Sequence, residues 1–161
     1  MSTTRFYKRP TALRRRVYDP LMRTLIQRVG FSGILDRRGK DTVQVLSVRG
    51  RRTGRLYHHP VGVSVHNGHR YLVGFYGQTE WALNLRAGTE AALSSRGVTQ
   101  PIRAIELAGA EKADFMRFLV QRYRFFARAW LKVNPNRMDE ADLARLLRDH
   151  PVFQVENLGE H

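Results

Sequence analysis

The residues best suited to chemistry lie in one short stretch, residues 47–60, which reads SVRGRRTGRLYHHP. Within it, Arg51, Arg52 and Thr53 stand between two glycines, the second of which is Gly54. Glycines let backbone N–H groups converge on an anion, and guanidinium groups bind phosphate or carboxylate through paired hydrogen bonds. The stretch therefore predicts an anion-binding loop. The alternative is a solvated hairpin turn whose arginines only keep the protein soluble.

Two adjacent histidines, His58 and His59, follow this loop in a segment typical of a strand. Neighbouring strand residues point to opposite faces of a sheet, so the two rings cannot easily share one metal ion. No carboxylate stands near them at a spacing that suits a metal site. We expect one of the pair to face a ligand or the core, and we expect no metal.

A second candidate segment, residues 75–87, reads FYGQTEWALNLRA. Its pattern predicts a strand end, a turn and a short helix that Thr79 caps, and the first N–H groups of a helix can receive an anion or a ring oxygen. Trp81 lies four residues before Leu85, so both share one helix face. The alternative is a helix that is merely packed by these two side chains, with Arg86 in solvent.

The charge of the chain points to an anionic partner. The 161 residues carry a net charge of +14, and residues 1–40 contribute 11 basic and 2 acidic side chains to it. Such a field attracts nucleic acid, anionic lipid or a small ligand with phosphate or carboxylate groups. We do not expect nucleic acid, because no nucleic-acid-binding module accompanies the arginines of the aromatic segment FMRFLVQRYRFF, whose spacing is typical of core.

Several classes of function are disfavoured by what the sequence lacks. There is no cysteine, which excludes a catalytic thiolate and a disulfide framework, and no Ser-His-Asp or paired-carboxylate arrangement can be recognised. No apolar run is long enough to cross a membrane, and the N-terminus lacks the apolar stretch of a signal peptide. We expect a cytoplasmic protein.

The periodicity of apolar residues predicts an α+β protein, mainly β, in which a small antiparallel barrel has helices at its edges. An Asn-Gly pair at Asn67 favours a tight hairpin turn, and Pro60 indicates an edge or a bulge. Two short helices are expected between residues 11 and 30, the second starting at Pro20. The other expected strands cover residues 43–48, 55–65, 70–76, 91–95, 102–107 and 152–155, and the other expected helices cover residues 79–86, 111–132 and 138–148.

Residues 45–87 combine these features in an order that resembles the deazaflavin-dependent nitroreductase family. That family has a strand, a G-R-[KR]-[ST]-G loop, a strand with a proline, a D/N-G hairpin, an apolar strand, a glycine turn and then W-x-x-N-L-[RK]-A. All of these parts occur here, and DHPVFQVENL near the end looks like the closing strand of the family. The resemblance extends over about residues 20–157.

This resemblance implies a split β-barrel of about six antiparallel strands that binds coenzyme F-420, an 8-hydroxy-5-deazaflavin with a phosphate and an oligoglutamate tail. The charge of the N-terminal segment indicates a basic arm over residues 1–19, and the resemblance implies one cofactor-binding domain over residues 20–161. The phosphate would lie at the arginine loop, and other residues would line the ring or support the pocket. The implied cofactor-binding residues are Arg51, Arg52, Thr53, Gly54, His58, His59, Val61, Phe75, Tyr76, Gly77, Gln78, Trp81, Asn84 and Arg86.

The implied activity is hydride transfer from reduced F-420 to an electron-poor small molecule such as a quinone, an enone or a nitroaromatic. Tyr123, Tyr76 or His58 would protonate or polarise that acceptor. The family members that reduce nitroaromatics carry several tyrosines after the last barrel strand, whereas Phe125 and Phe126 lack the hydroxyl here, so the acceptor stays open.

The sequence is also compatible with two other interpretations. One is an FMN-binding barrel of related shape, because the arginine loop would also serve the phosphate of FMN. The other is a non-enzymatic binder of anionic lipid or nucleic acid. The basic arm either rests on an anionic membrane or packs across the barrel mouth, and a homodimer is possible.

Overall fold

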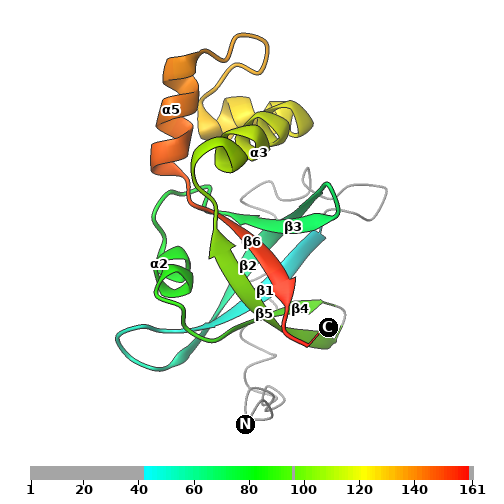
Figure 1. Ribbon diagram of the computed structural model, residues 1–161, viewed down its shortest axis with the longest axis vertical. Coiled ribbons are helices and arrows are strands. Elements are labelled where there is room, and N and C mark those ends of the chain that lie inside the picture. Colours follow the sequence, from blue (N-terminus) through cyan, green and yellow to red (C-terminus); the bar gives the residue numbers. More distant parts are fainter. Residues whose placement is uncertain (1–41, 96, 160–161) are drawn as a thin grey trace.

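The computed structural model describes residues 42–95 and 97–159. Its strands form a closed antiparallel barrel in the order β1-β2-β3-β6-β5-β4, with β4 paired back to β1 (Figure 1). The strands are β1 (Thr42–Arg49), β2 (Leu56–His66), β3 (His69–Val73), β4 (Ala91–Ser95), β5 (Val98–Glu106) and β6 (Val152–Asn157). The predicted fold class, a six-stranded antiparallel barrel with flanking helices, is confirmed.

The hairpin signals of the sequence are found where they were predicted. Asn67 and Gly68 both have positive φ angles, 49° and 78°, which the tight turn between β2 and β3 requires. Pro60 pairs with Val45 of β1 and lies in a part of β2 that has no partner in β3, so the strand has a free edge there. Strand β3 is shorter than expected and ends at Val73, because the chain turns away at the following glycine.

The barrel interior is a closed apolar core to which all six strands and helix α2 (Glu80–Arg86) contribute. Phe153, Leu46 and Leu72 are fully buried there, and full burial of such a side chain contributes about 1.5–3 kcal/mol. The main members are Leu46, Val48, Val61, Val63, Leu72, Trp81, Leu85, Leu93, Ile102, Phe153 and Val155.

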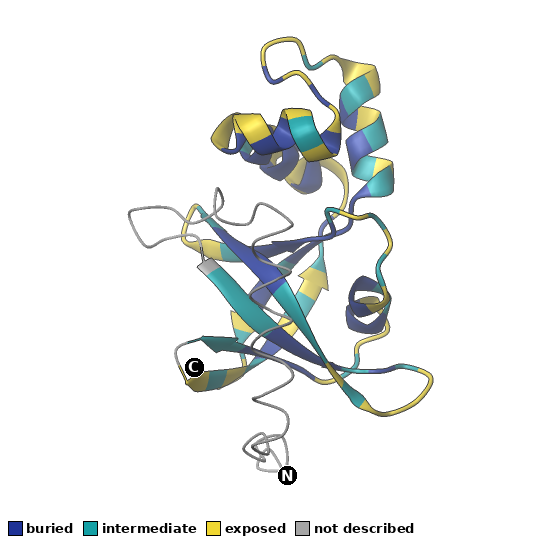
Figure 2. Cartoon of the chain, turned by 180° about the vertical axis from the view of Figure 1, so that it is seen from behind, coloured by how far each residue is buried: buried dark blue, intermediate teal, exposed yellow. Residues whose placement is uncertain are grey.

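A helical layer covers one end of the barrel (Figures 1 and 2). Tyr71, Val73 and Val152 point from the strands into this second core. The dark, buried sides of the helices face one another and the barrel, and their exposed residues face outward in Figure 2. The layer consists of α3 (Gly109–Arg122), α4 (Arg124–Phe126), the π-helical turn η3 (Ala127–Leu131) and α5 (Glu140–Asp149).

The long helix expected over residues 111–132 is therefore interrupted. Tyr123 leaves the helical conformation, with φ −117° and ψ 57°, and the π-helical turn follows. Lys132 ends that turn with a positive φ of 55°. π-Helical turns are frequent at functional sites, which makes this segment a candidate for function.

The expected helices between residues 11 and 30 and the basic arm of residues 1–19 lie outside the described residues. Within residues 42–95 and 97–159, none of the helices combines the length and apolar character that a membrane span requires.

Candidate functional site

The arginine loop between β1 and β2 is held by helix α2. The side-chain oxygen Oδ1 of Asn84 accepts a hydrogen bond of 3.1 Å from the backbone N–H of Arg51 and one of 2.9 Å from its guanidinium Nη1. The same Nη1 lies 2.8 Å from Glu80 Oε2, and this contact lowers the pKa of the Glu80 carboxyl. Arg51 thus attaches the loop to the helix, and this contact uses part of the hydrogen-bonding capacity of its guanidinium.

The loop keeps free donors at its tip. The N–H groups of Gly50, Arg51, Gly54 and Arg55 all donate to acceptors within the protein. Those of Arg52 and Thr53 donate to no acceptor among the described residues, and the Arg52 side chain is exposed. Two adjacent N–H groups beside a guanidinium form an arrangement that suits a phosphate.

Glycine is required at both ends of this tip. A side chain at Gly50 would lie 2.6 Å from Thr53 Oγ1 and 2.7 Å from the Tyr57 ring. Gly54 has a φ of +65°, which other residues rarely adopt. Glycine at these two positions therefore allows the loop to adopt this shape.

The strand register separates the two histidines, as the sequence predicted. Leu46, a barrel-interior residue, pairs with His59, and Ser47 pairs with His58. Directly paired residues share a face, so His59 points into the barrel and His58 points outward. His58 Nδ1 lies 2.8 Å from Ser47 Oγ, whereas His59 Nε2 is buried without a hydrogen-bond partner. Burial lowers the pKa of His59.

The outer face of β2 leads from the arginine loop to the helical layer. His58 is near the loop end of this face, Pro60 and Gly62 follow, and Ser64 is at the far end. Ser64 Oγ lies 3.4 Å from the hydroxyl oxygen of Tyr123, and both residues are buried. At about 3.3 Å per residue, the face from His58 to Ser64 is about 20 Å long.

Aromatic rings gather beside the Tyr123 end. Phe75 contacts Phe126 edge-on at 4.5 Å between ring centroids, and Phe126 stacks on Trp130 at 5.8 Å. Trp130 in turn meets Tyr76 edge-on at 5.7 Å. Tyr76 is 59% exposed, and its partial burial raises the pKa of its hydroxyl. The loop after β3 therefore joins the π-helical turn through ring contacts.

The remaining residues of the second candidate segment lie elsewhere. Trp81 is buried in the barrel interior against Phe153, with ring centroids 6.2 Å apart. Thr79 occupies the N-cap position of α2, but its side chain makes no capping hydrogen bond, so that detail of the prediction was wrong. The helix is packed against the barrel through the side chains of Trp81 and Leu85, as the alternative interpretation of this segment predicted.

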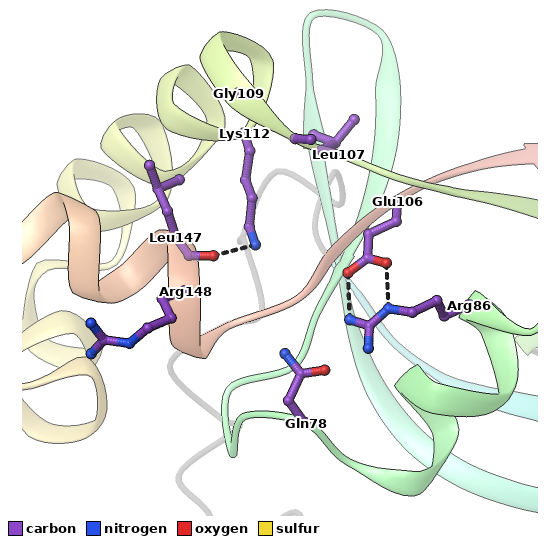
Figure 3. A pocket seen from close by; sticks show the side chains of 9 residues that line it. Gln78, Arg86, Glu106, Leu107, Gly109, Lys112, Leu147 and Arg148 are labelled. Carbon is purple, nitrogen blue, oxygen red and sulfur yellow. Dashed lines mark hydrogen bonds and ion pairs between the residues drawn. The ribbon is translucent and has the colours of Figure 1, made fainter.

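Gln78 and Arg86 line a separate cavity of about 430 Å³ between α2, β5, α3 and α5 (Figure 3). Arg86 donates two hydrogen bonds of 2.6 Å to the carboxylate of Glu106. This contact lowers the pKa of Glu106 and raises that of Arg86. Arg86 is thus occupied by an ion pair and does not reach the arginine loop through any interaction of the described residues.

The structure therefore divides the expected site residues among four places. Those at the loop and the outer face of β2 are Arg51, Arg52, Thr53, Gly54, His58 and Asn84. His59, Val61 and Trp81 point into the barrel interior. Phe75, Tyr76 and Gly77 form the loop beside Tyr123, whereas Gln78 and Arg86 turn to the separate cavity.

Sequence reasoning missed three residues of the outer face and its rim. Ser47 and Ser64 are hydroxyl residues of strands, and only the strand register shows that they point outward beside His58 and Tyr123. Trp130 was assigned to a regular helix. Alternation along β2, with His58, Pro60, Gly62 and Ser64 on one face, was a signal that could have identified Ser64.

These residues fit a phosphate-bearing ligand with a flat ring. The loop tip supplies two free N–H groups and the Arg52 guanidinium for an anion. Pro60 and Gly62 have little or no side chain that would obstruct a ring lying on the strand, and Ser47 and His58 supply polar groups at its edge. No group of three or more metal-ligating side chains is found within the described part of the chain.

Of three similar solved structures, the two with a TM-score of 0.50 support this fold. A structure described as a domain-swapped dimer has 21% identity and a TM-score of 0.50, and the match covers 86% of this chain and 99% of that one. A protein of unknown function from Agrobacterium tumefaciens has 13% identity and a TM-score of 0.50, covering 74% of this chain and 52% of that one. An F420-H2 dependent reductase has 23% identity and a TM-score of 0.49, covering 76% of this chain and 97% of that one. No curated protein sequence matches the chain significantly.

The family is established by its sequence model. Residues 22–134 match the model of the F420H(2)-dependent quinone reductase family. The match includes the arginine loop, the outer face of β2, helix α2 and Tyr123. The chain belongs to the F420H(2)-dependent quinone reductase family and is an oxidoreductase that uses coenzyme F-420.

Proposed function

We propose that this protein reduces a quinone with reduced F-420 bound along the outer face of β2. The observation that supports this most is the placement of two functional features on that one face. The arginine loop lies at its start, and the Ser64–Tyr123 pair lies at its end. Pro60 and Gly62, which have little or no side chain to obstruct a ring, lie between them and leave room for a flat ring.

In this proposal the loop binds the phosphate of the cofactor. Arg52 and the N–H groups of Arg52 and Thr53 make the direct contacts, and Arg51 holds the loop in shape through Asn84. Charge-assisted hydrogen bonds of this kind contribute about 1.5–3 kcal/mol each. His58, oriented by its hydrogen bond to Ser47, contacts the edge of the ring.

When bound, reduced F-420 supplies a hydride, which carries two electrons and one hydrogen nucleus. Reduction of a quinone to a hydroquinone needs one proton in addition. We assign this proton to the Tyr123 hydroxyl, which is hydrogen-bonded to Ser64 and recovers its proton from solvent. Tyr76, on the exposed rim, and His58 remain the other two groups of this face that could polarise the acceptor.

The aromatic rim suits the acceptor. Tyr76, Trp130 and Phe126 form a partly exposed wall next to Tyr123. Flat, electron-poor rings stack well on such side chains. A quinone fits this wall, and an enone or a nitroaromatic would use the same contacts.

The experiment that tests this function mixes the full chain with reduced F-420 and a water-soluble naphthoquinone and follows the absorbance of oxidised F-420. Quinone-dependent oxidation that exceeds the rate without protein supports the proposal. The same assay with reduced FMN as donor tests the FMN alternative, and activity with FMN alone would overturn the proposal.

We also propose peripheral contact with an anionic membrane. The predicted contact through residues 1–19 lies outside the described residues, and a second feature supports membrane contact in its own right. Residues 115–138 contain six arginines and lysines and no acidic residue. Phe125 in this segment is 83% exposed and Trp130 is 36% exposed. Exposed aromatic side chains among cations are typical of surfaces that bind anionic lipid.

The possible homodimer and the expected lack of nucleic-acid binding stay predictions. Light scattering of the purified chain measures the first. Titration with a DNA duplex at two salt concentrations measures the second.

A further inference from the structure

The cavity between α2, β5, α3 and α5 contains a buried cation that the proposed reaction does not use. Lys112 of α3 has 8% of its surface exposed and lines this cavity of about 430 Å³. In Figure 3 its amine descends from α3, Gln78 rises from the loop after β3, and the Arg86–Glu106 pair closes one side.

The ammonium group of Lys112 is incompletely bonded. Its one hydrogen bond within the described residues is donated to the carbonyl oxygen of Leu147, at 2.6 Å. An ammonium has three donors, so two of them lack a protein acceptor there. Both Glu106 oxygens already receive hydrogen bonds from Arg86, so this carboxylate acts on Lys112 only at a distance.

A buried ammonium without a bonded carboxylate is costly, and burial lowers the pKa of Lys112. Such a group is stabilised by any anion that reaches it. Lys112 belongs to the first turn of α3, and the N–H groups at the start of a helix favour the same kind of ligand. Both features belong to α3, and both favour an anion.

The other walls restrict the ligand further. Leu107, Ala108 and Leu147 form an apolar part of the lining, and Gln78 adds an amide. The Arg148 guanidinium is paired with Asp149 and points away from the other labelled polar groups in Figure 3, so we give it no role. The lining suits a small organic molecule that carries one carboxylate or phosphate group and an apolar body.

We propose that this cavity is a second binding site, distinct from the F-420 face, which holds a small organic anion through Lys112, Gln78 and the start of α3. The anion would receive hydrogen bonds from the two free donors of Lys112. The site would be filled independently of the cofactor, because no hydrogen bond or ion pair among the described residues joins Lys112 directly to the arginine loop.

The test uses the full chain without F-420 and titrates it with two probes, butyrate and inorganic phosphate, by heteronuclear NMR. The expected result is a saturable change in the amide signals of Gly109, Ala110 and Lys112. Replacement of Lys112 by Met should weaken binding by about tenfold or more, on the scale of a charge-assisted hydrogen bond. The matched control is Arg117→Met, which removes an exposed cation from the same helix and should leave the affinity unchanged.

The two probes distinguish the sources of the anion. Tighter binding of butyrate supports a carboxylate ligand with an apolar body, and tighter binding of phosphate supports a phosphate group. A second variant, Gln78→Ala, changes an exposed residue and should weaken binding without a risk of misfolding. Equal binding by wild type, Lys112→Met and Gln78→Ala would overturn the proposal.

The same variants are then titrated with F-420. Unchanged cofactor affinity in Lys112→Met supports two separate sites. Loss of F-420 binding together with anion binding would show that the cavity belongs to the cofactor site, which overturns the proposed independence. Because the anion titration contains no cofactor, it tests the anion site even if the protein does not reduce quinones.

Discussion

Asn84 and Arg51 are 33 residues apart, and the side chain of Asn84 binds both the backbone and the guanidinium of Arg51. One buried amide oxygen therefore connects the two motifs, the arginine loop and the W-x-x-N-L-R helix, that made the family recognisable in the sequence. The free N–H groups of the loop tip are positioned by a residue that does not itself reach them.

Replacement of Asn84 by Ala is expected to weaken F-420 binding although Asn84 need not touch the cofactor. The change leaves the Arg51 N–H without its acceptor, which costs about 1–3 kcal/mol of stability, and it loosens the loop tip. Fluorescence titration with F-420 should show about a tenfold weaker affinity. Gln100→Ala removes an exposed amide from β5 and serves as the control, and an unchanged affinity in Asn84→Ala would contradict the positioning role.

Replacement of Tyr123 by Phe should lower the turnover of quinone by about a hundredfold, the lower range for a general acid, and should leave F-420 affinity nearly unchanged. The reason is that only the hydroxyl is lost, while the ring keeps its packing. Steady-state kinetics give turnover, and fluorescence titration gives affinity. Tyr71→Phe is the control, because Tyr71 is a buried tyrosine of β3 whose hydroxyl makes no hydrogen bond among the described residues. Full turnover in Tyr123→Phe would mean that Tyr76 or His58, and not Tyr123, donates the proton to the quinone.

Replacement of His59 by Leu should change the pH dependence of stability. Burial lowers the pKa of His59 in the folded protein, so below about pH 6.5 the unfolded chain binds a proton that the folded chain does not. The free energy of unfolding of the wild type therefore falls as the pH drops through this range, and the variant should lose that part of the decrease.

Denaturant unfolding at several pH values between neutral and mildly acidic measures this difference. His69→Gln, an exposed substitution, should retain the behaviour of the wild type. The same slope in wild type and His59→Leu would mean that the ring of His59 takes up a proton in the folded barrel without cost.

Replacement of Phe125 and Trp130 by Ser should reduce binding to vesicles that contain anionic lipid. Each substitution removes exposed apolar area next to the cations of residues 115–138, so the part of the binding that does not depend on salt should fall most. Co-sedimentation at low and moderate salt measures the bound fraction. Val98→Ser, which removes a 60% exposed apolar side chain from β5, should bind like the wild type. Binding that is lost only on deletion of residues 1–19 would assign the membrane contact to the arm.

Much of the barrel could be predicted because its signals are local. The alternation of apolar residues predicted the boundaries of β1, β2 and β4 to within one residue, and Asn67-Gly68 predicted the turn. The break at Tyr123 could not be predicted, because aromatic residues at helical spacing continue through it. Only the packing of Phe126 and Trp130 against the loop after β3 shows why the chain departs from a regular helix there.

The site was harder to predict than the fold because the sequence of a segment does not show in which direction each side chain points. Val61 and His59 seemed close to the ligand in sequence, yet pairing of His59 with Leu46 turns both into the barrel. Arg86 belongs to the family motif, but its partner Glu106 lies on a strand 20 residues away. An ion pair between distant segments cannot be recognised from the local sequence of either segment.

The most direct test of the central claim is a fluorescence titration of the full chain with F-420 and, separately, with FMN, each repeated with Arg52→Ala and with Arg103→Ala. We expect that F-420 binds and FMN does not. We also expect that Arg52→Ala weakens F-420 binding by about tenfold, since one charge-assisted contact is lost, whereas the exposed control Arg103→Ala does not. Binding of FMN alone, or equal binding of F-420 by wild type and Arg52→Ala, would contradict the proposed site.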